Sequence, residues 1–324
     1  MGSSLSVRLG YVGSYGYNMI RTADANLVTP TILPDGRKFF PEDGEQINPN
    51  FSDIERIHSN AEYNYNSLQM VVQKSLSAGL RLGAAYTWSK TMSNADVITG
   101  SQIASTTDGA QDMENLAAEY SISAYDQRHT LVWNGRYDMP WERALTGGVA
   151  KAVLGGWSVN WIYSYGSGLP FNINTSFLNS RSGSSDENDR PNLRPGFSNN
   201  PIHGTTAGCQ GIQAGQKLRT PERWYDPCAF ELPDAGFFGN LGRNTVTLPN
   251  VNQVDFTIVK NTALTESKSL EFRAEFFNLF NRTHFGTPNQ QVFNPSRAHA
   301  GNEGRITTTS SSNREIQLGL KLIF

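Results

Sequence analysis

The sequence predicts an all-β fold in which antiparallel strands cross a membrane as a transmembrane β-barrel. Three observations predict it: apolar and polar residues alternate in several segments, several of these segments run about ten residues, and short and long connections alternate along the chain. The composition agrees, because 30 Gly, 12 Tyr, 17 Phe and 6 Trp, with much Asn, Ser and Thr, favour strands and polar loops.

Charge and hydropathy exclude other classes. A net charge of -2 with 17% charged residues gives no basic surface for nucleic acid and no acidic tail. No stretch approaches the roughly 18 to 20 consecutive apolar residues that a membrane-spanning helix needs. The first twenty residues lack a basic region followed by an apolar one, so we expect no signal peptide in this chain.

The alternation defines each strand in turn. In the segment 80–88, Leu80, Leu82 and Trp88 fall on one face, while Arg81 and Ser89 fall on the other. Weaker strand candidates lie near Ile54–Ile57 and Phe171–Asn174. The segments with this clear pattern are 5–11, 68–72, 80–88, 129–137, 157–165, 254–258, 270–276 and 316–324.

Alternation is shared by soluble β-sandwiches, but strand length and aromatic placement favour a membrane. Segments of about ten residues match the 9 to 11 that cross a bilayer at a tilt. Aromatic residues on the apolar faces, several near segment ends, are typical of an interfacial girdle, whereas the alternative places them in a sandwich core. These aromatic residues are Tyr86, Trp88, Trp133, Tyr137, Trp141, Trp157, Trp161 and Tyr165.

Connection lengths indicate the two sides of the membrane. Ser77–Gly79 and Leu264–Ser267 are tight turns and Pro140–Gly156 is moderate, whereas the stretches 90–128, 166–252 and 278–314 are long and polar. Short turns are periplasmic and long loops extracellular in outer-membrane barrels, which places Cys209 and Cys228 outside the cell. A disulfide between them, worth about 3 kcal/mol, is the favoured interpretation, and two free thiols are the alternative.

The long loops contain aromatic residues that would be exposed and could contact substrate: Trp224, Tyr225, Phe230, Phe237 and Phe238. Packing within the loops is the favoured alternative. The chain ends on Phe324, on the apolar side of an alternating strand, which resembles the signal that barrels present to their assembly machinery.

No pattern for catalysis or metal binding is found. The five His residues are scattered, and Ser123, Asp126 and His129 lack a nucleophile elbow, so we expect no enzyme, metal or cofactor. The run Asp186-Glu187-Asn188-Asp189 offers oxygen ligands for calcium without EF-hand spacing, and a solvated loop is favoured.

Several stretches together resemble the barrel of TonB-dependent transporters, most closely the Oar-like subgroup. Their order and spacing cover nearly the whole chain. The resemblance implies a 22-stranded barrel, plugged by an N-terminal domain and energised through TonB. The matching stretches are 63–69, 86–90, 125–129, 155–157, 167–171, 189–192, 238–244, 272–281 and the last strand.

Residues 1–324 would then form a partial barrel domain, without its plug domain, in the outer membrane. The expected role is TonB-coupled uptake of an oligosaccharide, peptide or chelate; the alternatives are a passive small barrel or adhesin and a secreted glycan-binding sandwich. The expected partners are outer-membrane lipid, the plug, the TonB complex and the assembly machinery. Charged residues on the predicted inward faces are typical of a wet lumen, and we hypothesise that Arg136, Glu271, Arg273 and Glu275 pair with each other or with the plug. An equally favoured alternative is a ladder of lumenal ion pairs without a role in transport. The full set is Arg8, Arg81, Arg136, Asp138, Asp255, Glu271, Arg273, Glu275 and Lys321.

Overall fold

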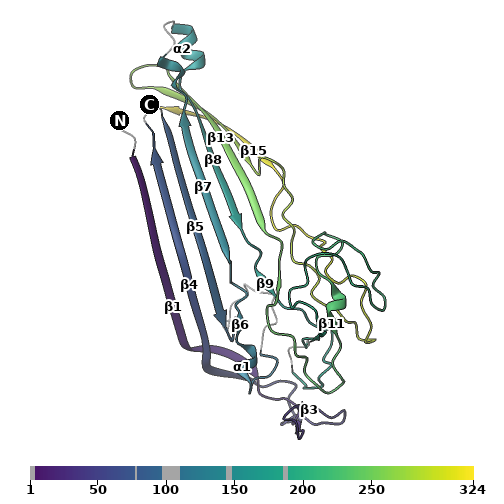
Figure 1. Cartoon of the computed structure of the whole chain (residues 1–324). Coiled ribbons are helices and arrows are strands. Elements are labelled where there is room, and N and C mark those ends of the chain that lie inside the picture. The colour runs from purple at the N-terminus through teal and green to yellow at the C-terminus, as the bar shows by residue number, and fades with distance from the viewer. Residues whose placement is uncertain (1–3, 77–78, 97–109, 144–147, 185–188) are drawn as a thin grey trace.

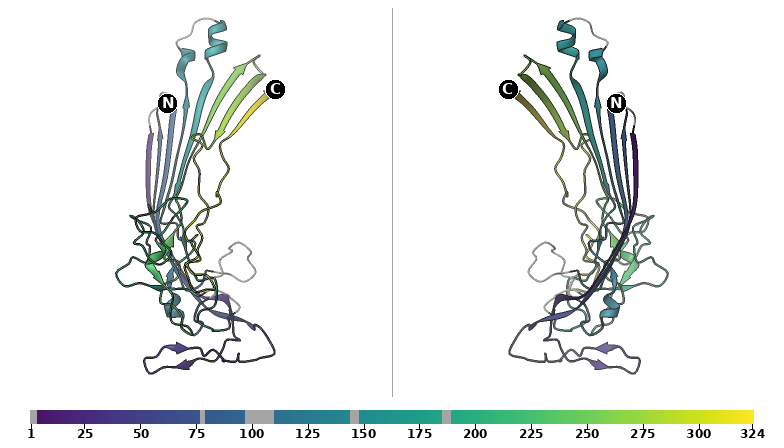
Figure 2. Two further views of the ribbon diagram at one scale, coloured as in Figure 1. Left: turned by 90° about the vertical axis from the view of Figure 1, so that its right-hand side faces the viewer. Right: turned by 90° about the vertical axis from the view of Figure 1, so that its left-hand side faces the viewer.

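The computed structural model contains one large, curved antiparallel sheet with an assembly of loops at one end (Figures 1 and 2). It describes residues 4–76, 79–96, 110–143, 148–184 and 189–324. No helix among these residues is long and apolar enough to span a bilayer.

Eight long strands form the sheet, and each of the eight predicted segments lies on one of them. Their spatial order is β1-β4-β5-β7-β8-β13-β14-β15, with the short β6 (Ser121–Ile122) also paired to β5. Every neighbour in this order is antiparallel. The bounds are β1 Ser4–Asp24, β4 Glu55–Ser75, β5 Leu80–Ser93, β7 His129–Asp138, β8 Trp157–Gly166, β13 Val251–Ala263, β14 Ser269–Phe277 and β15 Glu315–Ile323.

The strand register makes one face of the sheet continuously apolar. Residues opposite each other in a ladder share a face, and one such row runs through Leu9, Met70, Tyr86, Leu131 and Tyr165. An adjacent row on the other face consists of polar and small residues: Gly10, Gln69, Thr87, Thr130 and Gly166. The predicted alternation is therefore confirmed across strands as well as along them.

The apolar face has no second layer over it. Leu318 and Leu320 of β15 are 68% and 69% exposed, and Leu9 of β1 is 65% exposed. A sandwich buries such residues against another sheet. The sandwich alternative is therefore wrong, because the described residues place only one sheet beneath these side chains.

Long and short connections lie at opposite ends of the sheet, as the connection lengths predict (Figure 1). The short ones, together with both chain termini, are at the end near α2 (Gly148–Leu154). A fourth long connection, 25–54, was not predicted. It stands out only once β1 and β4 are seen to extend to 21 residues each.

These two strands are at least three times as long as the predicted segments 5–11 and 68–72. A pair of 21-residue strands rises about 70 Å, well beyond a hydrocarbon core of about 30 Å. Their ladder is interrupted between Gly16 and Ile20, where Asn18 has a φ of 55°. The weak candidate at Ile54–Ile57 is the start of β4, and the one at Phe171 gives only the two-residue β9 (Pro170–Phe171).

The remaining elements are short and lie in the connections. Two-residue strands pair as β2–β3, β9–β12 and β10–β11. Their bounds, with those of the other short elements, are β2 Thr31–Ile32, β3 Lys38–Phe39, β10 Asn192–Leu193, β11 Phe230–Glu231, β12 Val246–Thr247, α1 Leu116–Glu119, η1 Pro140–Arg143 and η2 Pro227–Ala229.

Candidate functional site: the assembly of long connections

The described parts of the connections 25–54, 94–128, 167–250 and 278–314 gather at one end of the sheet, and we call them the loop assembly (Figure 1). Two of them, 167–250 and 278–314, share an apolar core. The buried members of this core are Phe171, Ile173, Ile202, Trp224, Tyr225, Ala229, Phe230, Leu241, Val246, Val292, Phe293 and Ile306.

For three of the five loop aromatic residues, the favoured packing within the loops is confirmed and exposure is wrong. Trp224, Tyr225 and Phe230 are 4%, 0% and 2% exposed. The Trp224 indole N–H donates to the Thr247 carbonyl, and the Tyr225 hydroxyl donates to the Asn289 carbonyl, both at 2.7 Å. Because their rings and polar atoms are used inside the core, these residues hold the loops together.

Phe237 and Phe238 are half-buried and belong to a different contact. Their rings lie 5.2 Å from Phe39 and 5.1 Å from Phe40, respectively. Arg37 lies over the Phe237 ring at 4.7 Å. These contacts join the connection 167–250 to the hairpin β2–β3.

Three buried arginine–carboxylate pairs link separate connections, and sequence reasoning did not predict them. Arg190 meets Glu119 at 2.7 Å, Arg243 meets Asp96 at 2.6 Å, and Arg223 meets Glu303 at 3.1 Å. All six side chains are at most 10% exposed. Paired and hydrogen-bonded charges are tolerated in an interior, and breaking such a pair is costly.

Arg243 is the most heavily bonded of the three arginines. Its guanidinium also donates to the carbonyl oxygens of Ser93 and Glu119, at 2.5 Å and 3.2 Å. The next residue, Asn244, has a φ of 54° and donates from Nδ2 to Asp96 at 2.6 Å. Arg243 and Asn244 lie in the stretch 238–244, one of those that resemble TonB-dependent transporters, but the sequence did not indicate this role for them.

Two buried carboxylates have opposite pKa shifts. Burial raises the pKa of Asp189 to about 6, despite hydrogen bonds from the backbone and hydroxyl of Ser180. Burial also opposes ionisation of Glu303, but hydrogen bonds from His299, from backbone N–H groups and from Arg223 lower its pKa to about 2. Asp186, Glu187 and Asn188 lie outside the described residues.

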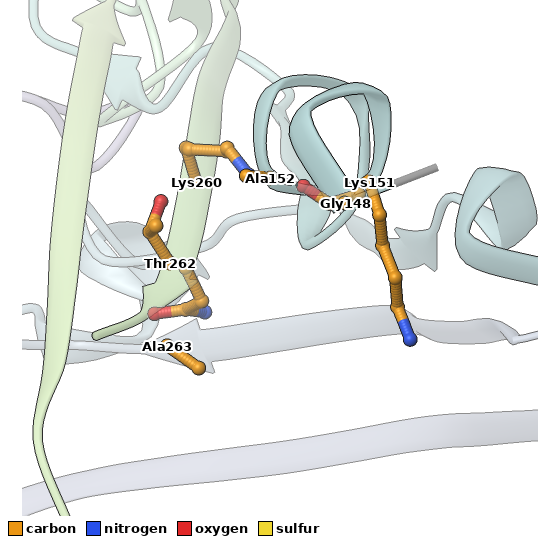
Figure 3. Close-up of a pocket in the computed structure, with 8 residues that line it drawn as sticks. Gly148, Lys151, Ala152, Lys260, Thr262 and Ala263 are labelled. Atoms are coloured by element: carbon orange, nitrogen blue, oxygen red, sulfur yellow. Dashed lines mark hydrogen bonds between the residues drawn. The ribbon is translucent and has the colours of Figure 1, made fainter. Parts of the chain in front are cut away.

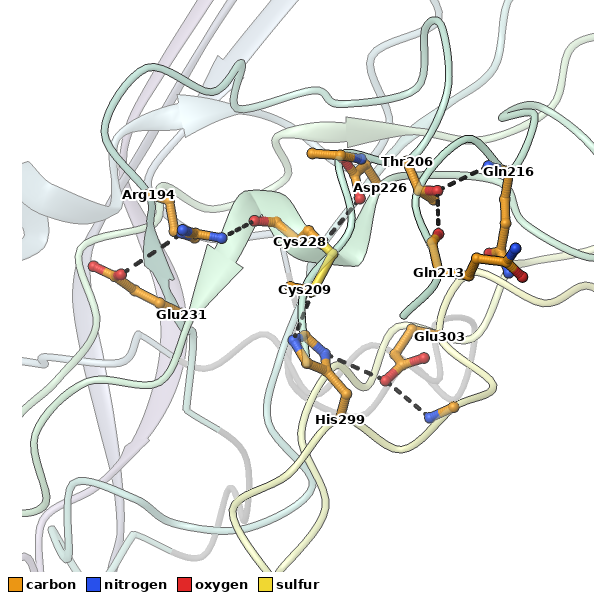
Figure 4. Close-up of a disulfide and its surroundings, with 12 residues drawn as sticks. Arg194, Thr206, Cys209, Gln213, Gln216, Asp226, Cys228, Glu231, His299 and Glu303 are labelled. Carbon is orange, nitrogen blue, oxygen red and sulfur yellow. Dashed lines mark hydrogen bonds and ion pairs between the residues drawn. A yellow bond between two sulfur atoms is a disulfide. The ribbon is translucent and has the colours of Figure 1, made fainter. Parts of the chain in front are cut away.

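The loop assembly contains a Cys209–Cys228 disulfide with a Cα–Cα distance of 5.6 Å (Figure 4). Asp226 accepts backbone N–H groups from Ala207 and Cys228, at 2.9 Å and 3.0 Å, and so holds both arms. His299 lies 3.4 Å from Cys209 Sγ, so the disulfide also contacts the connection 278–314.

A cavity of about 290 Å³ lies between the connection 25–54 and the loop end of β4. Small-molecule pockets of proteins start near this size. Lys38 at its edge donates to Asp112 and Glu114, both at 2.8 Å. The wall includes Leu27, Val28, Phe40, Arg56, His58 and Phe238.

Two nitrogen atoms beside this cavity lack a hydrogen-bond partner among the described residues: Arg21 Nη1, which is a donor, and His58 Nε2, which is a donor in the tautomer protonated at that atom. Arg21 is 3% exposed and opposes His58 in the β1–β4 ladder. Its Nη2 reaches the carbonyl oxygen of Met113, a residue of the cavity wall, at 3.4 Å. An unpaired buried donor is costly, so such atoms are rare and call for an explanation.

The predicted lumenal charges share the polar face of the sheet, but they do not all meet. Arg273 pairs with Glu271 at 3.2 Å and with Glu275 at 3.4 Å along β14. Arg136 instead pairs with Asp138 at 2.8 Å. Two intervening strands separate it from β14.

The residues considered for catalysis do not form a hydrogen-bonded set. The Ser123 hydroxyl donates to Asp96 at 2.8 Å, Asp126 accepts from the Thr91 backbone N–H, and His129 Nδ1 bonds the Tyr86 hydroxyl at 2.8 Å. No group of three potential metal ligands occurs in the part of the chain that the structure describes.

A single two-faced sheet with short turns at one end and long loops at the other defines a membrane β-barrel wall. Residues 1–317 match the family model described as an outer membrane beta barrel domain, and the chain belongs to this family. It is a protein of the bacterial outer membrane, its apolar face contacts lipid, and the loop assembly faces outward.

Among solved structures, the chain is similar to the outer membrane transporter YddB from Escherichia coli, with 8% sequence identity and a TM-score of 0.47. The match covers 98% of this chain and 30% of that transporter. No curated protein matches the sequence.

Proposed function

We propose that this chain forms part of the barrel and the outer loops of a TonB-dependent transporter of the Oar-like subgroup. The cargo would be a scarce or bulky nutrient: an oligosaccharide, a peptide or a chelate. The observation that carries the proposal is that the long connections form one cross-linked assembly with a cavity, above a barrel face that is polar and charged.

Substrate capture begins at the cavity. Its apolar wall, with Phe40 and Phe238, suits the body of a ligand, while Arg21 Nη1 and His58 Nε2 suit a hydrogen-bonding acceptor on it. Buried ion pairs hold the surrounding loops in place, so little ordering cost remains for binding.

Passage follows the polar face of the sheet. The Glu271–Arg273–Glu275 group lies there and offers charges to a plug domain, which TonB would displace.

In the described chain, β1 and β15 each pair on one side only, and unpaired backbone in hydrocarbon costs several kcal/mol per group. Further strands would complete a 22-stranded barrel, and the exposed Phe324 would address the assembly machinery.

The first test is energy coupling in the living cell. Growth of the host is compared on a ferric chelate, a maltooligosaccharide and a peptide digest, with the gene deleted and with TonB depleted. We expect both changes to abolish growth on the same nutrient. Normal uptake after TonB depletion would instead favour a passive barrel.

The second test concerns the cavity. His58→Ala removes a donor beside it, and we expect the half-saturating nutrient concentration to rise several-fold, as for the loss of one hydrogen bond. The exposed His203, elsewhere in the loop assembly, provides the matched control His203→Ala. Equal uptake curves for the two variants would exclude capture at this cavity.

A further inference from the structure

The motif Gly155-Gly156-Trp157 holds α2 in contact with the end of β13. Gly156 has a φ of 71°, and a Cβ there would lie 2.1 Å from the Asn261 carbonyl oxygen. The Asn261 N–H donates back to Gly156 at 2.9 Å. The Trp157 indole N–H donates to the Val153 carbonyl at 3.0 Å. The position of this short helix is therefore fixed by a close backbone contact that only glycine permits.

A cavity of about 230 Å³ lies between α2 and the end of β13 (Figure 3). Lys151 projects from α2, and Lys260 reaches from β13 toward the helix. The other lining residues are Gly148, Ala152, Gly155, Asn261, Thr262 and Ala263. Among the residues described, the lining thus carries two ammonium groups and no carboxylate.

Lys260 stands on the lipid-facing side of the sheet. Its register partners are Trp157 on β8 and Phe272 on β14, both in the apolar rows. Its ammonium donates to the Gly155 carbonyl and lies 5.8 Å from the centroid of the Trp157 ring. A lysine in such a position carries its charge toward the membrane–water interface, and an ammonium has three donors.

The helix itself exposes apolar side chains beside this charge. Val149, Val153 and Leu154 are 80%, 59% and 45% exposed, and Trp141, just before the helix, is 46% exposed. Short amphipathic helices with lysine on the polar side and aromatic neighbours lie in the interfacial layer of membranes. Because Lys260 continues the apolar face of the sheet, α2 extends the lipid-contacting surface that the fold already has.

We propose that α2 and the end of β13 form a binding site for the phosphate headgroup of an anionic phospholipid. The site lies in the periplasmic leaflet, because the short connections are at this end. Lys260 binds the phosphate, Lys151 adds a second positive charge to the lining of the site, and Val149, Val153 and Trp141 contact the acyl region. The site anchors the short-turn end of the barrel and does not depend on what the protein transports.

The test measures lipid retention by the full protein extracted from outer membranes into mild detergent. Native mass spectrometry compares bound phosphatidylglycerol with phosphatidylcholine of the same acyl chains. We expect preferential retention of phosphatidylglycerol. A lysine near an anionic membrane surface increases the affinity for that surface about fivefold. Lys151→Gln should therefore reduce lipid retention about fivefold, and the double variant with Lys260→Gln roughly 25-fold.

Two variants keep the test decisive. Lys260→Arg preserves the charge and should retain the lipid, which separates charge loss from a folding defect at the Gly155 contact. Lys74 lies at the same end and is opposite Leu5 and Leu82 on the apolar face, away from α2. The proposal is overturned if Lys74→Gln loses as much lipid as Lys151→Gln, or if the double variant retains phosphatidylglycerol normally.

Discussion

The sheet and the loop assembly of this protein are stabilised in opposite ways. The sheet turns its large apolar side chains outward and is held by ladders of backbone hydrogen bonds. The loop assembly turns its apolar side chains inward and adds buried ion pairs and a disulfide. The difference follows from the solvent, because lipid accepts an apolar surface and water does not.

The comparison also separates what each region contributes. The sheet requires apolar side chains on the face toward lipid and polar side chains on the face toward water. One apolar residue can therefore replace another on the first face, and one polar residue another on the second. The loop assembly needs particular partners, because each buried arginine must meet its own carboxylate. Changes in the loops should therefore be more specific in their effect than changes in the sheet.

The largest effect is expected from Arg243→Ala. The change leaves Asp96 buried without its cation, which costs about 3–5 kcal/mol, and should make the loops susceptible to protease while the barrel stays intact. Limited proteolysis with urea titration measures this. The surface pair Glu42–Arg181, in which the Glu42 side chain is 84% exposed, supplies the control, since Glu42→Ala should change stability by less than about 1 kcal/mol. Equal effects of the two variants would contradict the comparison.

A charge on the lipid face should come next. Leu318→Arg places a cation on the apolar side of β15, with an expected cost of about 2–4 kcal/mol near the bilayer midplane. Gln317→Arg, one residue away on the polar face, should cost much less. Refolding into vesicles, followed by urea titration, compares the two. A greater loss for Gln317→Arg would reverse the assignment of faces.

Removal of the disulfide should weaken the loops alone. The double variant Cys209→Ser, Cys228→Ser loses about 3 kcal/mol of loop stability, because the bridge closes a segment with a separation of 19 residues. The thermal transition of the loop assembly should fall, and the transition of the barrel should not. A shift of both transitions would show that the two regions unfold together.

The pH dependence should be smaller and should have a sign set by Asp189. Its folded pKa of about 6 exceeds the ordinary 3.8, so the folded state binds the proton more tightly, and stability rises as pH falls from 7 to 5, by roughly 1 kcal/mol. The pKa of Glu303 is shifted in the opposite direction. Below pH 4.5 the folded state therefore loses stability as the Glu303 carboxylate is protonated. Asp189→Asn should flatten the profile between pH 7 and 5. An unchanged profile would exclude Asp189 as its source.

The sheet was predictable from sequence because its information is local. A period of two residues gave all eight strands, and the same period gave their lipid and polar faces. The full lengths of β1 and β4 were not predicted. Residues 15–24 of β1 and 55–64 of β4 carry polar residues on both faces, because these parts of the strands lie beyond the hydrocarbon.

The loop assembly was not predictable in this way because its partners are remote. Arg243 and Asp96 are 147 positions apart, and Arg223 and Glu303 are 80 apart, so no periodicity connects them. For Trp224 and Tyr225 the sequence left both exposure and packing within the loops open, with packing favoured. They are buried because two long connections fold over them. Of these residues, only Arg243 lies in one of the stretches that carried the family resemblance.

The most direct test of the two-faced wall is a spin-label scan along β14 in vesicles. The native cysteines form a disulfide, which leaves a single introduced thiol at each position from 270 to 276 for labelling. Labels at Leu270, Phe272, Ala274 and Phe276 should be accessible to oxygen in the lipid, and labels at Glu271, Arg273 and Glu275 to a water-soluble nickel chelate. An accessibility profile without this period of two would contradict the account.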